Sequence, residues 1–182
     1  MRMPEILNRY KTNFSFEFFP PKTKESAQRL YETIEKLQPL EPCYVSVTYG
    51  AGGTTQDLTR DLVIKIQRDT NIPVVAHLTC VGGTKDDVYN ILQDYSKHGI
   101  NNILALRGDP PEGTGQFQQT EGGFENATEL VAFIREKFPS MGIGVAGYPE
   151  GHPETPNRLR ELEFLKEKVD AGADYICTQL FF

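Results

Sequence analysis

Six short apolar runs recur along the chain, and segments with a helical pattern separate them. The runs return roughly every 30 residues, the length of a βαβ unit, with one longer interval. They span residues 14–19, 44–49, 74–80, 103–106, 143–148 and 175–182. Apolar runs of this length predict buried strands.

Apolar residues between these runs recur every three or four positions, which is the period of an amphipathic helix. Five such sets occur: Leu30, Ile34 and Leu37; Leu58, Leu62 and Ile66; Val88, Ile91, Leu92 and Tyr95; Leu130, Phe133 and Ile134; Leu159, Leu162, Leu165 and Val169. Strict alternation of strand and helix predicts a parallel sheet, either closed as a barrel or open and doubly wound.

Residues typical of helix ends support these assignments. Asn126, with a glutamate three residues later, has the form of a capping box. Thr155, followed by a proline, predicts an N-cap and a first helical position. Gly99 and Gly172 each follow a helical pattern and precede an apolar run, as a left-handed helix end does.

Polar residues decide between the barrel and the open sheet. A doubly wound sheet usually carries a glycine-rich phosphate loop after its first strand, and none follows residues 14–19. Instead, polar or turn-forming residues stand at the C-terminal end of every predicted strand: Glu17, Thr48, His77, Thr79, residues 107–109, Tyr148 and Gln179. A site assembled from all the loops at one end is typical of a TIM-type (β/α)₈ barrel. We therefore predict an α/β barrel of which about six strands are present.

Alternation within the first strand places its side chains on two faces. The phenylalanines at alternate positions of 14–18 share one face, suited to a helix layer, while Ser15 and Glu17 share the face that would point into the barrel. The same count pairs inward residues on other strands: Ser46 with Thr48, His77 with Thr79, and Cys177 with Gln179. A half-exposed strand with ordinary polar alternation is the alternative for any one of them, and recurrence on several strands favours the barrel.

Composition and charge restrict the class of partner. The chain has 182 residues, of which 38% are hydrophobic, enough for one domain with a substantial core. Its formal net charge is −6 and Lys and Arg are nowhere clustered, which argues against nucleic acid and anionic membranes as partners. No apolar window approaches the length of a membrane span. We expect a cytoplasmic protein that acts on a small molecule.

The cysteines predict neither a disulfide framework nor a metal site. Cys43, Cys80 and Cys177 are far apart, and none has a metal-type neighbour at short spacing. Each stands in an apolar run, so we expect buried free thiols.

Six segments carry recognisable motifs in a fixed order. They are FSFEFFPPKT at 14–23, YVSVTYG at 44–50, AHLTC at 76–80, LALRGDPP at 104–111, VAGYPEGHPE at 145–154 and TQLFF at 178–182. As a set, and at this spacing, they resemble the successive signature segments of the methylenetetrahydrofolate reductase family. A single Arg-Gly-Asp would carry almost no weight, but six segments over nearly the whole chain are highly specific.

The resemblance implies a barrel that binds FAD at the C-terminal ends of its strands. NADH or NADPH would bind there first, and 5,10-methylenetetrahydrofolate would bind in the same place afterwards. The implied activity is flavin-dependent reduction of this folate to its 5-methyl form, a step of one-carbon metabolism and methionine biosynthesis. Nothing in the sequence separates NADH from NADPH.

The resemblance assigns catalytic roles to Glu17 and Asp109. Opening of the folate ring needs a proton on N10, and Glu17 matches the family's acid. Burial among its phenylalanine neighbours would favour the protonated form of the carboxyl. Asp109 matches a residue near the flavin and the pterin, where its charge would favour a cationic folate and tune the flavin. A turn role before Pro110 is compatible with this.

Binding roles follow for further matched residues. The resemblance places around FAD the residues Thr48, His77, Arg107, Gly108, Asp109, Ala127, Tyr148, His152 and Lys168. Arg107 and Lys168 would supply positive charge, and Gly108 would allow close backbone approach. Gln179 would bind the folate together with the two catalytic carboxylates, and would also bond the nicotinamide amide. For His77 and Gln179, satisfying polar groups of the core is the alternative.

The length of the chain leaves such a barrel unfinished. The family's barrel has two more strand and helix units, so we expect residues 1–182 to form a single FAD-binding domain that is truncated at its C-terminus. Six strands would leave two sheet edges unpaired. An inactive fragment, a flavin-binding remnant and a flavin barrel enzyme of the proline dehydrogenase type stay as alternatives. At full length we expect a homo-oligomer. The sequence departs from the family's pattern at Asn126 and Glu161, where an aromatic residue and an aspartate are common.

Overall fold

One parallel six-stranded sheet runs through the computed structural model, which describes residues 1–9, 11–49, 53–110, 117–155 and 157–182. The strands are β1 (Ser15–Phe18), β2 (Tyr44–Val47), β3 (Val74–Thr79), β4 (Asn102–Leu106), β5 (Gly142–Gly147) and β6 (Tyr175–Thr178). Each strand pairs in parallel with the next one along the chain. The predicted succession of six β/α units is therefore confirmed, although the last strand ends at Thr178 and does not continue to residue 182.

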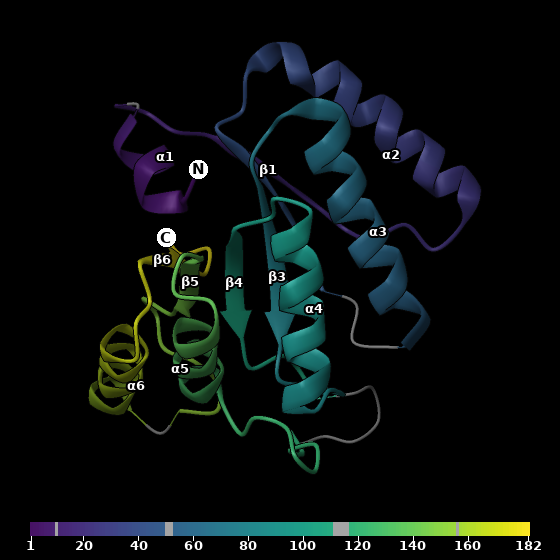
Figure 1. Ribbon diagram of the computed structural model, residues 1–182. Coiled ribbons are helices and arrows are strands. Elements are labelled where there is room, and N and C mark those ends of the chain that lie inside the picture. Colours follow the sequence, from purple (N-terminus) through teal and green to yellow (C-terminus); the bar gives the residue numbers. More distant parts are fainter. Residues whose placement is uncertain (10, 50–52, 111–116, 156) are drawn as a thin grey trace.

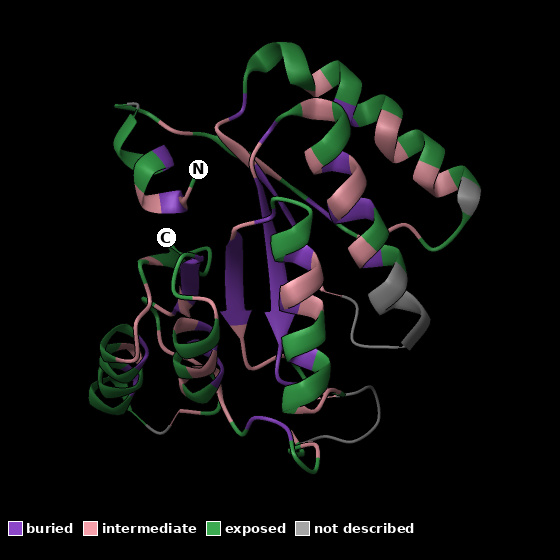
Figure 2. Ribbon diagram, in the orientation of Figure 1, coloured by how far each residue is buried: buried purple, intermediate pink, exposed green. Residues whose placement is uncertain are grey.

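Among the described residues, five helices cover the outer face of this sheet (Figure 1). They are α2 (Lys24–Leu37), followed by the 3₁₀ turn η1 (Gln38–Leu40), then α3 (Gly53–Thr70), α4 (Lys85–Lys97), α5 (Ala127–Lys137) and α6 (Arg158–Asp170). Outward strand residues such as Val47, Leu78 and Ile103 are buried in the main core beneath the helices. Figure 2 shows β3 and β4 buried while the outer sides of the helices are exposed. Because burial of one large aliphatic side chain contributes roughly 1.5–3 kcal/mol, this layer holds the helices on the sheet.

The sheet curls toward its inner face, which brings β6 back toward β1. Burial raises the pKa of the Cys177 thiol on β6, and the nearby carboxylate of Glu17 on β1 raises it further. The two strands are nonetheless not paired with each other in the described sheet. The result is an incomplete TIM-type barrel, as predicted.

A short helix that the sequence pattern did not predict, α1 (Met3–Arg9), closes the inner face at the N-terminal ends of the strands. Met3 and Ile6 are buried there against Val75 and Leu104, in a cluster separate from the main core. Seven residues form too short a helix to be stable alone. Its stability therefore comes from filling the bottom of the barrel.

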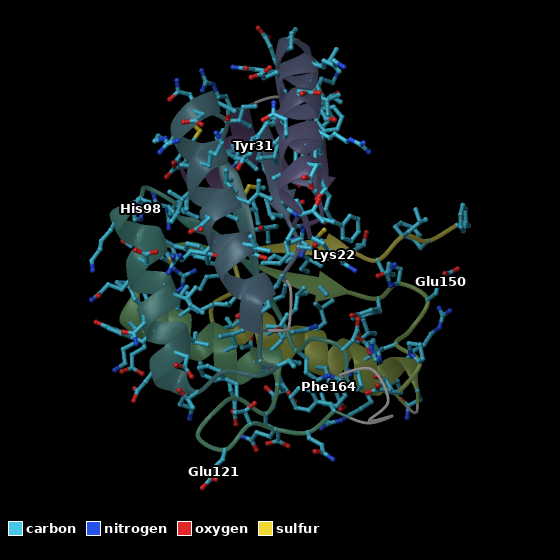
Figure 3. All side chains as sticks on the ribbon, turned by 90° about the vertical axis from the view of Figure 1, so that its right-hand side faces the viewer. Lys22, Tyr31, His98, Glu121, Glu150 and Phe164 are labelled. Atoms are coloured by element: carbon cyan, nitrogen blue, oxygen red, sulfur yellow. The ribbon has the colours of Figure 1, made fainter. Side chains whose placement is uncertain are left out.

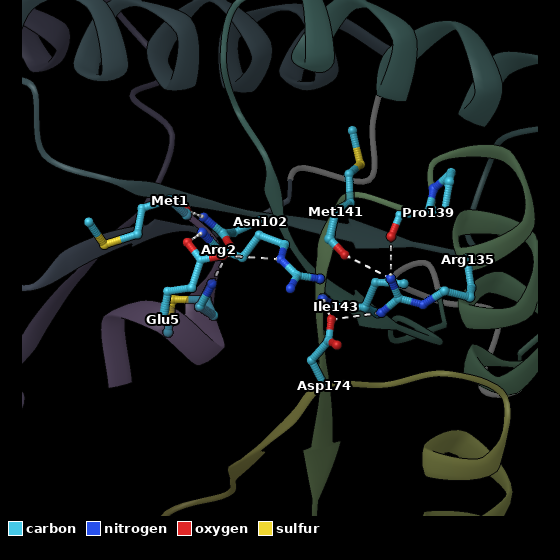
Figure 4. A network of polar contacts seen from close by, with 10 residues as sticks. Met1, Arg2, Glu5, Asn102, Arg135, Pro139, Met141, Ile143 and Asp174 are labelled. Atoms are coloured by element: carbon cyan, nitrogen blue, oxygen red, sulfur yellow. Dashed lines mark hydrogen bonds and ion pairs between the residues drawn. The ribbon is translucent and has the colours of Figure 1, made fainter. Parts of the chain in front are cut away.

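Asn102 fixes the beginning of the chain to the start of β4 (Figure 4). Its carboxamide oxygen accepts a hydrogen bond from the backbone N–H of Met3 at 2.7 Å, and its Nδ2 donates to the carbonyl of Met1 at 3.1 Å. Arg2 and Glu5 form an exposed ion pair beside it. The buried asparagine is thus satisfied entirely by backbone that lies about a hundred positions earlier in the sequence.

Arg135 joins the turn before β5 to the turn before β6 (Figure 4). Its guanidinium donates to the carbonyl of Met141 at 3.1 Å, to the carbonyl of Gly172 at 2.7 Å and to Asp174 Oδ2 at 2.7 Å. The same Asp174 oxygen accepts from the backbone N–H of Ile143 at 2.8 Å. One side chain therefore sets the spacing between the last two β/α units.

The helix starts agree only in part with the sequence prediction. Asn126 caps α5 and accepts from the backbone N–H of Glu129, whose carboxylate bonds the residue before the cap instead of the cap itself. For α6 the prediction is wrong, because the N-cap is Asn157 and not Thr155. Asn157 is extended, and its side-chain oxygen accepts from the N–H three residues later. Pro156 lies outside the described residues.

Both predicted glycine ends are confirmed. Gly99 follows α4 with a φ of +76°, and Gly172 follows α6 with a φ of +120°. This left-handed region is costly for residues with a Cβ, so the two glycines end their helices without strain.

The buried side of α6 is not the one that its apolar spacing predicts. Leu159, Leu162 and Val169 are exposed, whereas Glu161 and Lys168 are buried. Because β6 is an edge strand, the described residues provide no neighbour that covers the apolar side of the helix. Of the four predicted apolar positions only Leu165 packs against the core, so the prediction of an inward apolar stripe is wrong for the other three.

Candidate active site

Three polar side chains from neighbouring strands meet on the inner face of the sheet. Glu17 on β1 lies opposite Ser46 on β2 in the strand register, and Ser46 Oγ donates to Glu17 Oε2 at 3.2 Å. His77 Nε2, on β3, lies 3.4 Å from the same oxygen. Strand alternation predicted this shared face for all three residues, and the structure confirms it.

The surroundings of Glu17 differ from the prediction. Its side chain is 51% exposed, so the expected burial among phenylalanines is wrong. Phe18 is buried in the core beneath the helices, and Phe16 packs against that core. Adjacent residues of a strand point to opposite faces, and therefore these rings cannot cover the carboxyl.

His77 and Thr79 occupy the inner face of β3, and both are largely buried. Burial lowers the pKa of His77, while the charge of Glu17 acts in the opposite direction, so the imidazole is neutral at neutral pH. His77 Nε2 is close to Glu17 without the geometry of a hydrogen bond, and Thr79 Oγ1 also lacks a partner within the described ranges. Buried polar atoms of this kind are usually satisfied by water or a ligand.

Gly108 brings the loop after β4 into close contact with β3. Its φ is +87°, and a Cβ at this position would lie 2.8 Å from Val81 Cγ2 and 2.9 Å from Thr79 Cβ. Both the backbone conformation and the lack of space require glycine. The loop therefore passes directly beside the unpartnered hydroxyl of Thr79.

Arg107 is held between the loops that follow β4 and β5. Its guanidinium forms an ion pair with Glu154 at 2.7 Å, and it lies 5.2 Å from the centre of the Phe117 ring. The hydrogen bond to Glu154 raises the pKa of Arg107, which keeps the side chain charged. A fixed cation therefore stands at this end of the barrel.

Asp109, Tyr148 and His152 complete this second group. The rings of Tyr148 and His152 stack edge to face with centroids 4.7 Å apart, and His152 Nδ1 accepts from the backbone N–H of Glu154 at 3.1 Å. Burial raises the pKa of Tyr148, and the charge of Asp109 raises it further. The C-terminal ends of β4 and β5 thus bring together a cation, a carboxylate and an aromatic pair.

The remaining predicted site residues lie at other points. Thr48 follows β2, exposed Gln179 follows β6, and Ala127 is the first residue of α5. Lys168 is buried on α6, where its ammonium donates to the carbonyl of Ala146 at 2.7 Å. Burial lowers the pKa of Lys168. Its side chain is therefore engaged with the backbone of β5.

Sequence reasoning missed two contacts in the loop after β5. One is the ion pair of Glu154 with Arg107, and the other is the hydrogen bond that Thr155 Oγ1 donates to Glu161 Oε2 at 2.8 Å. Glu154 is the last residue of the motif segment 145–154, and its place in that segment could have marked it as a candidate site residue. The Thr155 contact carries no such signal, because it depends on where α6 begins.

The three thiols are free, but only one of them is buried as predicted. Burial raises the pKa of the Cys80 thiol to about 12. Cys43 is half-buried, and Cys177 is exposed as a residue although its thiol is partly covered. Cys43 precedes β2 at the N-terminal end of the sheet and Cys177 lies on the edge strand β6, so an apolar run in the sequence does not ensure that its cysteine is covered. In the part of the chain that the structure describes, no His, Cys, Asp and Glu side chains gather as a metal site would require.

Two hollows in the surface lie away from the polar clusters. One, of about 490 Å³, lies between α2 and the loop after β1 and is lined by Lys22 and Arg29. The other, of about 510 Å³, lies at the N-terminal ends of the strands beside Cys43 and Asn71. Neither is lined by Glu17, so this carboxyl faces the open inner side of the sheet.

The two ends of the barrel are far apart. Figure 3 shows His98, in the turn before β4, and Glu150, in the loop after β5, on opposite sides of the molecule. Lys22, in the loop after β1, is labelled in the same view. Except for Ala127 and Lys168, which lie on α5 and α6, the candidate residues lie in the last part of their strands or in the loops that follow, and so belong to the end at which Glu150 lies.

Sequence comparison decides the family, because the sequence model of the methylenetetrahydrofolate reductase family matches residues 2–182 of this chain. The chain belongs to the methylenetetrahydrofolate reductase family. It is 42% identical over 191 residues to methylenetetrahydrofolate reductase (NADH) 1 of Arabidopsis thaliana, covering 100% of this chain and 32% of that one. The 5,10-methylenetetrahydrofolate reductase of Escherichia coli K12 is 43% identical over 170 residues, with coverages of 93% and 55%. Methylenetetrahydrofolate reductase 2 of Saccharomyces cerevisiae is 40% identical over 177 residues, with coverages of 94% and 30%.

This member of the methylenetetrahydrofolate reductase family therefore spans between about a third and about half of the length of these relatives. Its fold resembles that of 2,3-dimethylmalate lyase, with a TM-score of 0.60 and 13% identity over 96% of this chain and 60% of that one. At this identity the likeness shows the fold alone. No helix within the described ranges is long and apolar enough to cross a membrane.

Proposed function

We propose that the protein carrying this chain reduces 5,10-methylenetetrahydrofolate to 5-methyltetrahydrofolate, with FAD as cofactor and NADH or NADPH as electron donor. Family membership supports the reaction class. The observation that carries the proposal is the carboxyl of Glu17, which stands beside Ser46 and His77 on the inner face of the barrel. In barrels of this type the site lies at the C-terminal ends of the strands.

The residues at the ends of β3 and β4 suit a flavin nucleotide. His77 Nε2 and Thr79 Oγ1 are buried and need partners, Gly108 lets the loop after β4 pack against Thr79, and Arg107 provides a cation for a phosphate. We assign to the cofactor Thr48, His77, Arg107, Gly108, Asp109, Ala127, Tyr148, His152 and Lys168. When bound, FAD supplies the redox chemistry, taking electrons from the nicotinamide and passing them to the folate.

The chain's own side chains would handle protons, charge and orientation. Glu17 delivers a proton to N10 of the folate, the bond between N10 and the bridging carbon breaks, and a 5-iminium cation remains. Asp109 places a negative charge where it stabilises that cation. Gln179 donates and accepts hydrogen bonds at the edge of the pterin.

The Glu17→Gln variant tests this assignment. We expect folate reduction to fall by about 10²-fold or more, because the proton donor is lost, while flavin reduction by the nicotinamide stays near normal. Glu35→Gln, an exposed position on α2, is the matched control and should change neither half-reaction. Equal loss in both half-reactions contradicts the assignment. FAD binding without any folate turnover in the unsubstituted protein would favour a flavin-binding remnant.

A further inference from the structure

An ion pair joins the loop after β4 to the loop after β5. Arg107 Nη1 donates to Glu154 Oε2 at 2.7 Å, although the two residues are 47 positions apart in the sequence. The strands before these loops are hydrogen-bonded neighbours, with Ala105 opposite Val145. The two loops therefore leave the sheet side by side, and the ion pair connects them at the end where the candidate site lies.

Hydrogen bonds within the loop after β5 hold the backbone of Glu154. His152 Nδ1 accepts from the backbone N–H of Glu154 at 3.1 Å, and the carbonyl of His152 accepts from the N–H of Thr155 at 2.9 Å. Just before them, the carbonyl of Tyr148 accepts from the N–H of Gly151 at 3.0 Å. These bonds form two successive turns, and Glu154 lies in the second. Its carboxylate therefore extends from backbone whose course is fixed.

Arg107 is restrained from two sides and stays charged. The ring centre of Phe117 lies 5.2 Å from its guanidinium carbon, a distance at which an aromatic ring attracts a cation. The hydrogen bond between Arg107 and Glu154 raises the pKa of the first and lowers the pKa of the second. Both members of the pair are therefore ionised at neutral pH, and the guanidinium lies between a carboxylate and a ring.

The ion pair leaves much of the guanidinium available. Its N–H groups form a rigid fork, in which Nε and Nη2 make up an edge that matches two oxygens of a phosphate. Glu154 contacts Nη1, and the residues that the structure describes place no hydrogen-bond partner on Nε or Nη2. Arg107 can therefore bind a second anion through two parallel hydrogen bonds without releasing Glu154.

The carboxylate of Glu154 has two opposite effects on such an anion. It repels a phosphate, but the Glu154 side chain is 52% exposed, and water and salt screen the repulsion between exposed charges. It also restrains Arg107 before the anion arrives, and immobilising one long side chain on binding lowers affinity by roughly twofold to tenfold. Because the repulsion is screened and the restraint is not, we expect the restraint to dominate.

We infer that Glu154 is a positioning residue, which holds Arg107 by Nη1 so that the Nε and Nη2 edge binds a phosphate of the flavin cofactor. Glu154 does not touch the cofactor and acts through Arg107. The inference rests on the proposed function, because FAD is the phosphate-bearing ligand assigned to this end of the barrel. The family resemblance gives Glu154 no such role.

The test measures FAD affinity in the protein that carries this chain, freed of flavin and titrated with FAD by fluorescence quenching. We expect Glu154→Ala to weaken FAD binding roughly threefold to tenfold, and Glu154→Gln to weaken it less, because the amide oxygen still accepts from Nη1. Glu150→Ala removes the same charge from an exposed position of the same loop (Figure 3) and should leave the affinity unchanged. Tighter FAD binding in Glu154→Ala would overturn the inference, since the carboxylate would then be a competitor of the phosphate.

A double-substitution cycle separates positioning from general damage to the loop. Adding Glu154→Ala to Arg107→Ala should cause no further loss of FAD affinity, because the residue that Glu154 positions is already absent. Urea unfolding of the flavin-free protein should be nearly the same with and without Glu154→Ala, since exposed ion pairs contribute little to stability. An equal loss of affinity in both backgrounds, or a large loss of stability, would overturn the inference.

Riboflavin tests whether the contact is to a phosphate, because it has the ring system of FAD without the phosphates. Its affinity should be the same in Glu154→Ala and in the unsubstituted protein. Equal weakening of riboflavin and FAD binding would place Arg107 on the ring and overturn the inference. If the unsubstituted protein binds FAD but does not reduce the folate, the proposed reaction fails while the affinity measurements still support the inference. If it binds no FAD, both fail.

Discussion

At the scale of single residues, Gly108 has the strictest conformational requirement among the candidate site residues. We expect Gly108→Ala to lower the free energy of unfolding by about 2–5 kcal/mol, the sum of roughly 1–2 for the left-handed backbone and 1–3 for overlap with Val81 and Thr79. Gly151→Ala is the matched control, since its φ of +91° is similar but the space around it is open. Urea unfolding measures both. Equal losses would show that contact with β3 is unimportant.

His77 makes stability depend on pH on the acid side. Burial holds its pKa in the folded chain below the ordinary 6.5, and the charge of Glu17 offsets only part of this effect. The unfolded chain therefore takes up a proton at higher pH than the folded chain does, and stability falls as pH drops below about 6.5. We expect His77→Gln to reduce this loss in urea unfolding between about pH 7.5 and pH 5. His98→Gln, at an exposed position, is the control, and an unchanged slope in His77→Gln would contradict the argument.

Which residue faces inward could be predicted from the sequence, but how deeply it is buried could not. The period of two along a strand is fixed by backbone geometry, so Glu17, Ser46 and His77 were placed on one face correctly. Exposure depends instead on what covers that face. Glu17 is half exposed although its neighbours in sequence are aromatic, because those rings pack on the other side.

At the scale of elements, α1 depends on one buried asparagine. We expect Asn102→Ala to lower the free energy of unfolding by roughly 1–3 kcal/mol, because the buried N–H of Met3 loses its acceptor, and to make α1 more susceptible to proteolysis. Asn101→Ala is the control, because the neighbouring side chain donates to the carbonyl of Gly99 in its own turn. Unchanged protease resistance of α1 in Asn102→Ala would show that apolar contacts alone hold the helix.

The elements that could be predicted are those whose partners lie in the same repeating unit. Helices α2 to α5 were found from apolar spacing, because each packs on the sheet beside its own strands. α1 was missed although Met3, Ile6 and Leu7 have helical spacing, because seven residues are too few to predict a helix and its burial depends on strands that come much later. On α6 the apolar residues were found but their side was not, since periodicity identifies a stripe and does not identify what covers it.

At the scale of the whole molecule, the sheet formed by the described residues has two edge strands, β1 and β6, and apolar side chains are exposed on α6, on β6 and after it. They are Leu159, Leu162, Val169, Ile176, Leu180, Phe181 and Phe182. Exposed apolar side chains of this kind favour association. The loops that carry the candidate cofactor residues are attached to this same open sheet, whereas a catalytic site requires its supporting elements to be held to within about half an ångström.

We therefore expect the 182-residue chain, expressed by itself, to self-associate, to bind FAD weakly or not at all, and to show no folate reduction. Sedimentation and the flavin absorbance that co-purifies with the chain measure the first two properties. Replacing Leu159 and Leu162 together by glutamate should reduce association with little effect on unfolding, because both side chains are already exposed. A yellow, monodisperse and active chain would contradict the expectation.

The docking of α1 has a consequence for the order of events during synthesis. Met3 leaves the ribosome well before Asn102, which accepts its hydrogen bond and is 99 positions later. At about 5–20 residues per second, the helix segment waits on the order of 5–20 s for its partner. During that interval Met3 and Ile6 are apolar side chains with nowhere to be buried, open to chaperones and to neighbouring nascent chains. A translational pause before residue 102 would prolong that exposure, whereas one placed after Tyr175 would not.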